Sequence, residues 1–360
     1  AGLHTVEFRH EHQQNLRDST DIGSYFLYWN KPGTGNVYEI VPPANFVGLT
    51  MTTYVLQTDE TPASVITDYE VKVLVGTSSL PESNCKMYPN GTYKPTGILQ
   101  RFGEPGKLNF GLMTGSYIKN ISGGVLRKAV GPFNDEIVTN TGQFKQNADP
   151  SFKGIVYTID KLMIMNFDYS NYVHEKCGWI TERPINEGEC MNWGNPIGEM
   201  MYEGLRYFAG AKAATGTFTY GTSTSYEDNI LGLPKATWDD PFVTHGACAR
   251  PFMLVISDIH PSYDSNQLPG VYSGFATSPS FTDTFSSWDQ PPVAFDAEDL
   301  GEKISTQEKI AGNHYMGQVG SVRDSSCLPK NMTGNGFGRA RGLCPEEPTK
   351  QGSFYSASAA

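Results

Sequence analysis

Acidic and amide side chains follow a short apolar run in the stretch DIHPSYDSN, residues 258–266. Asp258, Asp264 and Asn266 offer the oxygen ligands that calcium prefers. The stretch lacks the turn glycine and the final glutamate of a helix–loop–helix calcium loop, so it does not match that motif. A turn rich in hydrogen-bonding side chains is the simpler interpretation. A cation cluster at the end of a strand stays the alternative.

Cysteine is the second residue type that could carry chemistry, and the chain has six of them. Two pairs each bracket a segment rich in glycine, proline and asparagine, where a crosslink would help most, and two cysteines remain for a long-range pair. The predicted pairs are Cys177–Cys190, Cys327–Cys344 and Cys85–Cys248. Other pairings stay open, as do unpaired thiols in a cytosolic protein. Zinc is disfavoured because no two cysteines form a knuckle.

The sequence motifs of common catalytic centres are missing from the chain. We find no nucleophile elbow, Walker loop, dinucleotide-binding loop or zinc-protease helix. No spacing singles out two carboxylates for glycoside hydrolysis. The sequence therefore predicts a protein that is not an enzyme, with a secreted carbohydrate-active hydrolase as the alternative.

Composition and charge narrow the class of protein further. The chain has 360 residues, a formal net charge of −11 and 12% aromatic residues, which favours a packed core over disorder. The acidic balance opposes binding to nucleic acid or anionic lipid. No apolar run approaches the roughly 18 residues of a membrane span. The low charged fraction predicts an exported protein, and the start AGLHTVEF predicts a mature terminus or a cut chain.

Several segments have the composition of the elements that would position these residues. Strand-like runs predict a β-rich portion over 1–80, and 107–118 with 123–131 predict a buried strand and a hairpin arm. Residues 210–250 are polar and aperiodic, which predicts a surface insertion. FMLVISD, 252–258, is a continuous apolar run that predicts a buried parallel strand. Ligands of open α/β sheets gather at the carboxyl ends of such strands.

The stretch WGNPIGEMMYEGLRYFAG, 193–210, predicts one helix with a clear start and end. Asn195 can cap it, Pro196 suits the first helical position, and Gly210 suits a left-handed end. The apolar stripe consists of Ile197, Met201, Leu205 and Phe208. The loop before the helix either caps it or faces a ligand.

A series of ordered motifs covers roughly residues 70–357. They include YPNGTYKPTGILQRFG, NPIGEMMYEGLRYFAG and CARPFMLVISDIHPSYDSNQLPG, and the series ends with GLCPEEPTKQGSFYSA. In this order they resemble the PilC/PilY-type tip adhesins and biogenesis factors of bacterial type IV pili. The resemblance implies an α/β fold with a von Willebrand factor A-like parallel sheet over 81–300 and long disulfide-stapled loop insertions. Residues 301–360 would then be a disulfide-stapled segment that leads towards a β-propeller absent from the chain.

The resemblance also implies a role for two residues. In A domains a threonine before a helix and an aspartate at a strand end help to hold a divalent metal. Asn195 takes the threonine position and Asp258 the aspartate position, which suggests a calcium or magnesium ion. The Asp-x-Ser-x-Ser motif is missing, because its nearest match, VLQTDETPAS at 55–64, has Ala63 where a hydroxyl is needed. We therefore expect an incomplete site and a capping role for Asn195.

The function implied by the family is binding at the cell surface. We expect a protein that is exported through the periplasm to the pilus tip on the bacterial surface. There it would bind minor pilins and a host or abiotic surface, and support pilus assembly, adhesion and twitching motility. Open sheet edges would suit pilin contact by strand addition. A purely structural filament component is the second alternative.

Overall fold

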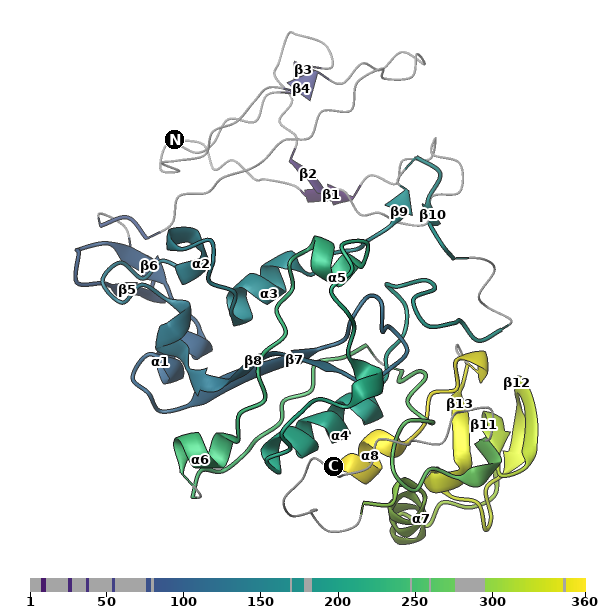
Figure 1. Ribbon diagram of the computed structural model, residues 1–360. Coiled ribbons are helices and arrows are strands. Elements are labelled where there is room, and N and C mark those ends of the chain that lie inside the picture. The colour runs from purple at the N-terminus through teal and green to yellow at the C-terminus, as the bar shows by residue number, and fades with distance from the viewer. Residues whose placement is uncertain are drawn as a thin grey trace. The chain divides into compact units, whose positions relative to one another are not determined.

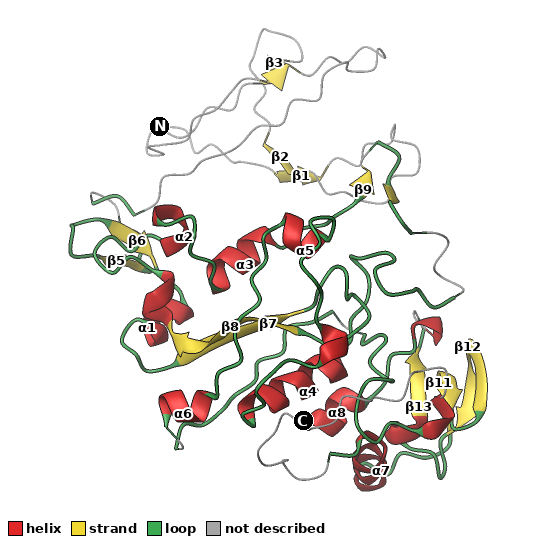
Figure 2. Cartoon of the chain, in the orientation of Figure 1, coloured by secondary structure: helices red, strands yellow, loops and turns green. Residues whose placement is uncertain are grey.

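The structure is a computed structural model of the 360-residue chain (Figures 1 and 2). It describes residues 76–78, 81–168, 170–177, 183–246, 248–258, 260–275, 295–345 and 348–360, with the backbone of four short strands before residue 56. The chain forms two compact units, Ala1–Gly97 with Thr139–Gly142, and Ile98–Val138 with Gln143–Ala360. The domain boundaries predicted near residues 80 and 300 stay predictions.

Short antiparallel strand pairs make up the regular structure described in the first unit. The pairs are β1 (Phe8–His10) with β2 (Tyr25–Leu27), β3 (Val37–Tyr38) with β4 (Tyr54–Val55), and β5 (Cys85–Met87) with β6 (Tyr93–Pro95). The first four strands fall inside the predicted β-rich portion. Apart from residues 76–78, the rest of that portion lies outside the described residues.

A two-stranded hairpin lies at the centre of the second unit. β7 (Asn109–Thr114) pairs antiparallel with β8 (Val125–Pro132), as the segments 107–118 and 123–131 predict. Figure 1 shows the hairpin between α3 (Ile155–Lys161), which contacts β8, and α4 (Ile197–Phe208), which contacts β7. The hairpin therefore holds two helices far apart in the sequence in one unit.

The predicted helix over residues 195–209 is confirmed as α4. It ends at Phe208, and Gly210 follows with φ of 80°, a conformation that glycine adopts without strain. The start differs from the prediction. Pro196 is the N-cap residue, and no side chain caps the helix.

The C-terminal part of the second unit adds a small sheet and two helices. The elements are α7 (Ala297–Gln307), β11 (Asn313–Val319), β12 (Val322–Asn331), β13 (Ala340–Leu343) and α8 (Tyr355–Ala359). The sheet is antiparallel with β11 between β12 and β13. Tyr202 of α4, Ala297 and Tyr355 belong to one buried apolar cluster, which joins α4, α7 and α8.

The second unit also contains shorter α-helices and one more strand pair. They are α1 (Ile98–Gly103), α2 (Lys145–Ala148), β9 (Phe167–Asp168), β10 (Val173–His174), α5 (Glu227–Ile230) and α6 (Pro241–His245). β9 and β10 pair antiparallel. No helix among the described residues has the length and apolar content needed to cross a membrane.

The predicted strand over residues 252–258 is wrong. These residues are not paired as a strand, and every strand pair that the structure describes is antiparallel. A continuous apolar run favours extended backbone but does not specify a pairing partner. The mixed helices and small sheets agree with the predicted α/β class, while the parallel sheet does not occur among the described residues.

Two of the three predicted disulfides are confirmed. Cys177–Cys190 joins the ends of one loop with a Cα–Cα distance of 4.7 Å, and Cys327–Cys344 joins β12 to the end of β13 at 5.8 Å. The third pair is wrong, because Cys85 and Cys248 are free thiols. It was predicted only by elimination. In the structure the Cys85 thiol instead donates a hydrogen bond to Oε2 of Glu82 at 3.2 Å.

A buried ion pair ties three parts of the second unit together. Nη2 of Arg127 on β8 lies 2.7 Å from Oδ1 of Asp228 on α5, and both side chains are fully buried. Oδ2 of Asp228 also accepts hydrogen bonds from the backbone of Tyr117 and Ile118, which follow β7. The prediction that 210–250 is a surface insertion is therefore wrong at Asp228, which lies in the core.

Replacing Asp228 with asparagine should leave the Arg127 charge buried without its counter-ion. We expect Asp228→Asn to lower the free energy of unfolding by about 3 to 5 kcal/mol, measured by urea denaturation with the disulfides intact. The control is Asp299→Asn, which removes an exposed pair with Lys303 and should cost less than about 1 kcal/mol. Equal losses in the two variants would contradict the account.

Candidate functional site

Asn195 and Asp258, which the sequence places in one candidate site, line the same small polar pocket. The pocket has a volume of about 210 Å³. Its lining consists of Ile185, Asn192, Trp193, Gly194, Asn195, Asp258, His260, Ser262, Tyr263 and Lys350. The predicted meeting of the loop before α4 with the end of the 252–258 run is thus observed, although that run is not a strand.

Asn195 clamps two loops together instead of capping α4. Its side-chain Nδ2 donates to Oγ of Ser257 at 2.8 Å and to the carbonyl of His260 at 3.0 Å. Its backbone N–H donates to Oγ of Ser262, and its carbonyl accepts from the backbone of Ser262 and Ile197, each at 2.8 Å. The capping prediction is therefore wrong, because the side chain is used to hold the 257–262 loop.

The loop that carries Trp193 is built around Asn120, which sequence reasoning missed. The buried Nδ2 of Asn120 donates to the carbonyls of Glu189, Cys190 and Trp193, and its Oδ1 accepts from the backbone of Gly188. One amide side chain thus satisfies four backbone groups of a single loop. No periodic pattern or motif marks such a residue, because the interaction spans about 70 positions of the chain.

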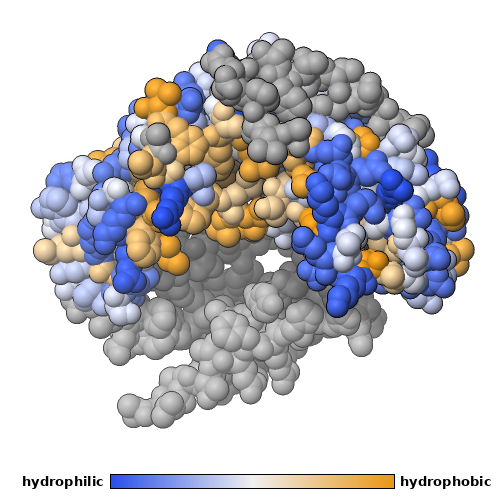
Figure 3. All heavy atoms as spheres, turned by 90° about the horizontal axis from the view of Figure 1, so that it is seen from below, coloured by the Kyte–Doolittle hydropathy of each residue, from blue (hydrophilic) through white to orange (hydrophobic). Residues whose placement is uncertain are grey.

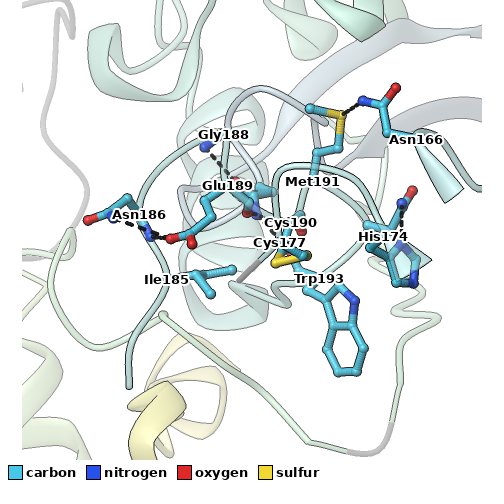
Figure 4. Close-up of a disulfide and its surroundings, with 12 residues drawn as sticks. Asn166, His174, Cys177, Ile185, Asn186, Gly188, Glu189, Cys190, Met191 and Trp193 are labelled. Carbon is cyan, nitrogen blue, oxygen red and sulfur yellow. Dashed lines mark hydrogen bonds between the residues drawn. A yellow bond between two sulfur atoms is a disulfide. The ribbon is translucent and has the colours of Figure 1, made fainter. Parts of the chain in front are cut away.

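The Cys177–Cys190 disulfide and an aromatic pair support the same loop (Figure 4). The rings of His174 and Trp193 meet edge to face with centroids 6.2 Å apart. Arg183 pairs with Glu189, and this interaction lowers the pKa of the Glu189 carboxyl to about 2. The crosslinked loop therefore presents Trp193 with 41% of its surface exposed.

Gly194 allows the loop to pass close to Asn120. Its φ of 109° is one that other residues rarely adopt, and a Cβ at this position would lie 2.1 Å from the carbonyl oxygen of Asn120. A larger residue would push the loop away from the pocket. The small polar loop therefore has a geometric reason for its glycine.

Asp264 is not part of a cation cluster with Asp258. It is fully buried, and its carboxylate accepts from the backbone of Ser353 at 2.7 Å and of Gly198 at 3.2 Å. Burial raises the pKa of Asp264 to about 6 and raises that of the neighbouring Glu199 well above its usual value. These two carboxyls hold the start of α4 in place. Of the two aspartates, only Asp258 lines the pocket.

The residues present do not complete a metal site by themselves. Calcium takes about six to eight oxygen ligands, whereas the candidate set supplies one carboxylate and one amide. Nδ2 of Asn195 donates to Ser257 and His260, so the side-chain oxygen Oδ1 is the atom suited to a cation. Within the described ranges no three His, Cys, Asp or Glu side chains are grouped to hold a metal ion. The metal role of Asn195 and Asp258 stays a prediction.

A second, larger surface feature runs along α4 itself. It is an apolar groove of about 850 Å³ between β7, α4, α6 and residues 249–256. Three of the four residues of the predicted apolar stripe line it, namely Ile197, Met201 and Phe208. Figure 3 shows apolar side chains gathered in a hollow between two more hydrophilic regions.

The charged side of α4 is buried instead. Glu203 and Arg206 pair at 2.9 Å, and Thr215 donates its N–H and its hydroxyl to the Glu203 carboxylate at 2.8 and 2.6 Å. The Arg206 guanidinium also lies over the ring of Trp238. The charged residues of α4 thus find their partners in the interior. Part of the apolar stripe of the same helix faces the open groove.

Comparison with known proteins identifies the family. The family model of the PilY1 homolog, second domain, matches residues 110–360. The chain belongs to the PilY1 homolog family. A type IV pilus biogenesis factor PilY1 homolog of Xylella fastidiosa is 41% identical over 312 residues, which cover 82% of this chain and 20% of the relative. Another from the same organism is 29% identical over 224 residues, 56% of this chain and 18% of that relative.

The resemblance to PilY-type proteins is thereby confirmed. The chain spans about a fifth of the length of these PilY1 homologs. No solved structure matches it.

The raised pKa of Asp264 predicts how stability changes with pH. Because the folded state holds this proton more tightly than the unfolded chain, the stabilising contribution is complete below about pH 4 and is lost as the pH rises through 6. Between pH 4 and 7, wild type should lose roughly 2 kcal/mol of unfolding free energy relative to Asp264→Asn. Denaturant titrations across that range measure the difference; a constant difference would contradict the assignment.

Proposed function

We propose that this chain is part of an exported, non-catalytic type IV pilus factor that acts by binding at the pilus tip. Its partners would be minor pilins on one side and a host or abiotic surface on the other, and binding would support pilus assembly, adhesion and twitching motility. The two relatives are pilus biogenesis factors by name, which supports the pilus biogenesis part of this proposal. The adhesin and pilin-binding parts rest on the chain's own surfaces.

The observation that carries the proposal is the open apolar groove beside α4. Large apolar surfaces in contact with water are costly, and on a folded protein they usually mark a binding site for another macromolecule. Leu99 and Leu108 extend the apolar lining and are themselves exposed. A groove of this kind suits a protein partner better than a small polar substrate.

The polar pocket at the start of α4 would be the place for an external ligand. The partly exposed Trp193 can stack on a ring of the ligand, while Lys350 and Asp258 line the pocket with charges of both signs. The meeting of Asn195 and Asp258 at this pocket also supports a von Willebrand factor A-like origin of the region, which we include in the proposal.

Direct capture of pilins tests the proposal. The immobilised chain is incubated with purified minor pilins from the bacterium that encodes it, and we expect saturable binding. The test variant is Met201→Glu, which places a charge in the groove and should reduce pilin capture by at least about tenfold relative to wild type. An unchanged unfolding midpoint in this variant shows that the loss is local.

Two results would overturn the proposal in different directions. Release of sugars from polysaccharide substrates, abolished by changing a pocket carboxylate such as Asp258, would favour the secreted hydrolase. Assembly of the chain alone into filaments, without pilin capture, would favour the purely structural component.

A further inference from the structure

Residues 250–256 run along the groove as an extended segment with a strand-like alternation. Phe252, Leu254 and Ile256 are 78%, 85% and 87% exposed, whereas Met253 and Val255 are only 38% and 41% exposed. Alternating exposure is what one side of a β-strand shows when it packs on a protein surface. The segment therefore has the side-chain pattern of a strand without a strand partner.

The backbone of the same segment is available for pairing. Within the described part of the chain, no N–H or C=O group of residues 250–256 takes part in a hydrogen bond. Unpaired backbone groups along an extended apolar segment form a template for another strand. Five consecutive residues, Phe252 to Ile256, offer N–H groups, since Pro251 has none.

Two basic residues of the groove favour an occupant that carries a negative charge. Lys107 and Arg250 line the groove, and no aspartate or glutamate does so, although the whole chain has a net charge of −11. Both cations are exposed, and neither forms an ion pair with the part of the chain that the structure describes. An occupant with a carboxylate beside its apolar residues would complement them.

We propose that the groove binds an extended apolar strand of a protein partner, which pairs with the backbone of residues 252–256 and places a carboxylate against Lys107 and Arg250. Alternate side chains of the added strand would face Met201 and Phe208 of α4. The added strand would also cover the part of the α4 stripe that now lines the open groove. The inference rests on the proposed function for the nature of the partner, a pilus protein.

Strand addition can be tested with a defined peptide. The probe is an eight-residue peptide that alternates valine and threonine and carries two glutamates at one end. Fluorescence anisotropy with the intact chain should show saturable binding. N-methylation of alternate peptide residues should abolish it in one of the two frames, because it blocks one hydrogen-bonding edge.

Proline variants locate the pairing on this chain. Successive N–H groups of a strand point to opposite edges, so Leu254→Pro and Val255→Pro each remove a donor from a different edge. We expect one of them to weaken peptide binding roughly tenfold, as for one lost hydrogen bond, and the other to act as its matched control. Equal binding by both folded variants, or equal loss, would overturn strand addition.

A charge reversal tests the direction. The double variant Lys107→Glu with Arg250→Glu should prefer a peptide ended by two lysines over the glutamate peptide, which reverses the preference of wild type. Unchanged preference would overturn the charge assignment. A concentration-dependent dimer that excludes the peptide would overturn the proposal in favour of a second copy of this chain in the groove.

The inference and the proposed function can fail separately. If wild type captures minor pilins and the proline variant that loses the peptide still captures them equally well, the inference is wrong and the proposed function stands. If the peptide binds as expected but no minor pilin is captured, the strand site stands and its assignment to a pilus partner is wrong.

Discussion

The ion pair between Arg127 and Asp228 is the interaction on which the second unit depends. A buried pair is tolerated only when its remaining donors and acceptors are also satisfied. Arg127 fulfils this condition through Tyr220 at 2.6 Å and the carbonyl of Gly115 at 2.9 Å, and Asp228 through the hydroxyl of Ser116 at 2.9 Å. The network thereby joins the β7–β8 hairpin to α5, a segment with no apolar pattern of its own.

The burial of charged residues of α4 places apolar residues of the same helix at the surface. α4 packs its charged residues Glu203 and Arg206 inward and leaves Met201 and Phe208 on the groove. Beside it, the 252–256 segment exposes both apolar side chains and backbone groups. Under the proposed function this arrangement is useful, because the apolar surface for binding is displayed on a scaffold stabilised by hydrogen bonds and disulfides.

The sequence predicted the elements that depend on local pattern. The helix at 195–209, the hairpin arms and the two disulfides within loop-rich segments were found because periodicity, turn residues and short spacing determine them. The predictions that failed depended on contacts between distant parts of the chain. The predicted Cys85–Cys248 bond, the cap at Asn195 and the strand at 252–258 each required knowledge of a partner elsewhere in the chain. Polar residues such as Asn120 and Asp228 were missed because buried charges and amides look like surface residues in a sequence.

The central claim is that residues 252–256 form an unpaired, strand-like edge of the apolar groove in the isolated chain. Hydrogen–deuterium exchange read by mass spectrometry tests it most directly, with peptides from 250–257 compared with peptides from β8. The account predicts near-unprotected exchange at Met253, Leu254 and Val255 and strong protection in β8, whose backbone is paired with β7. Protection of 252–256 equal to that of β8 would contradict it.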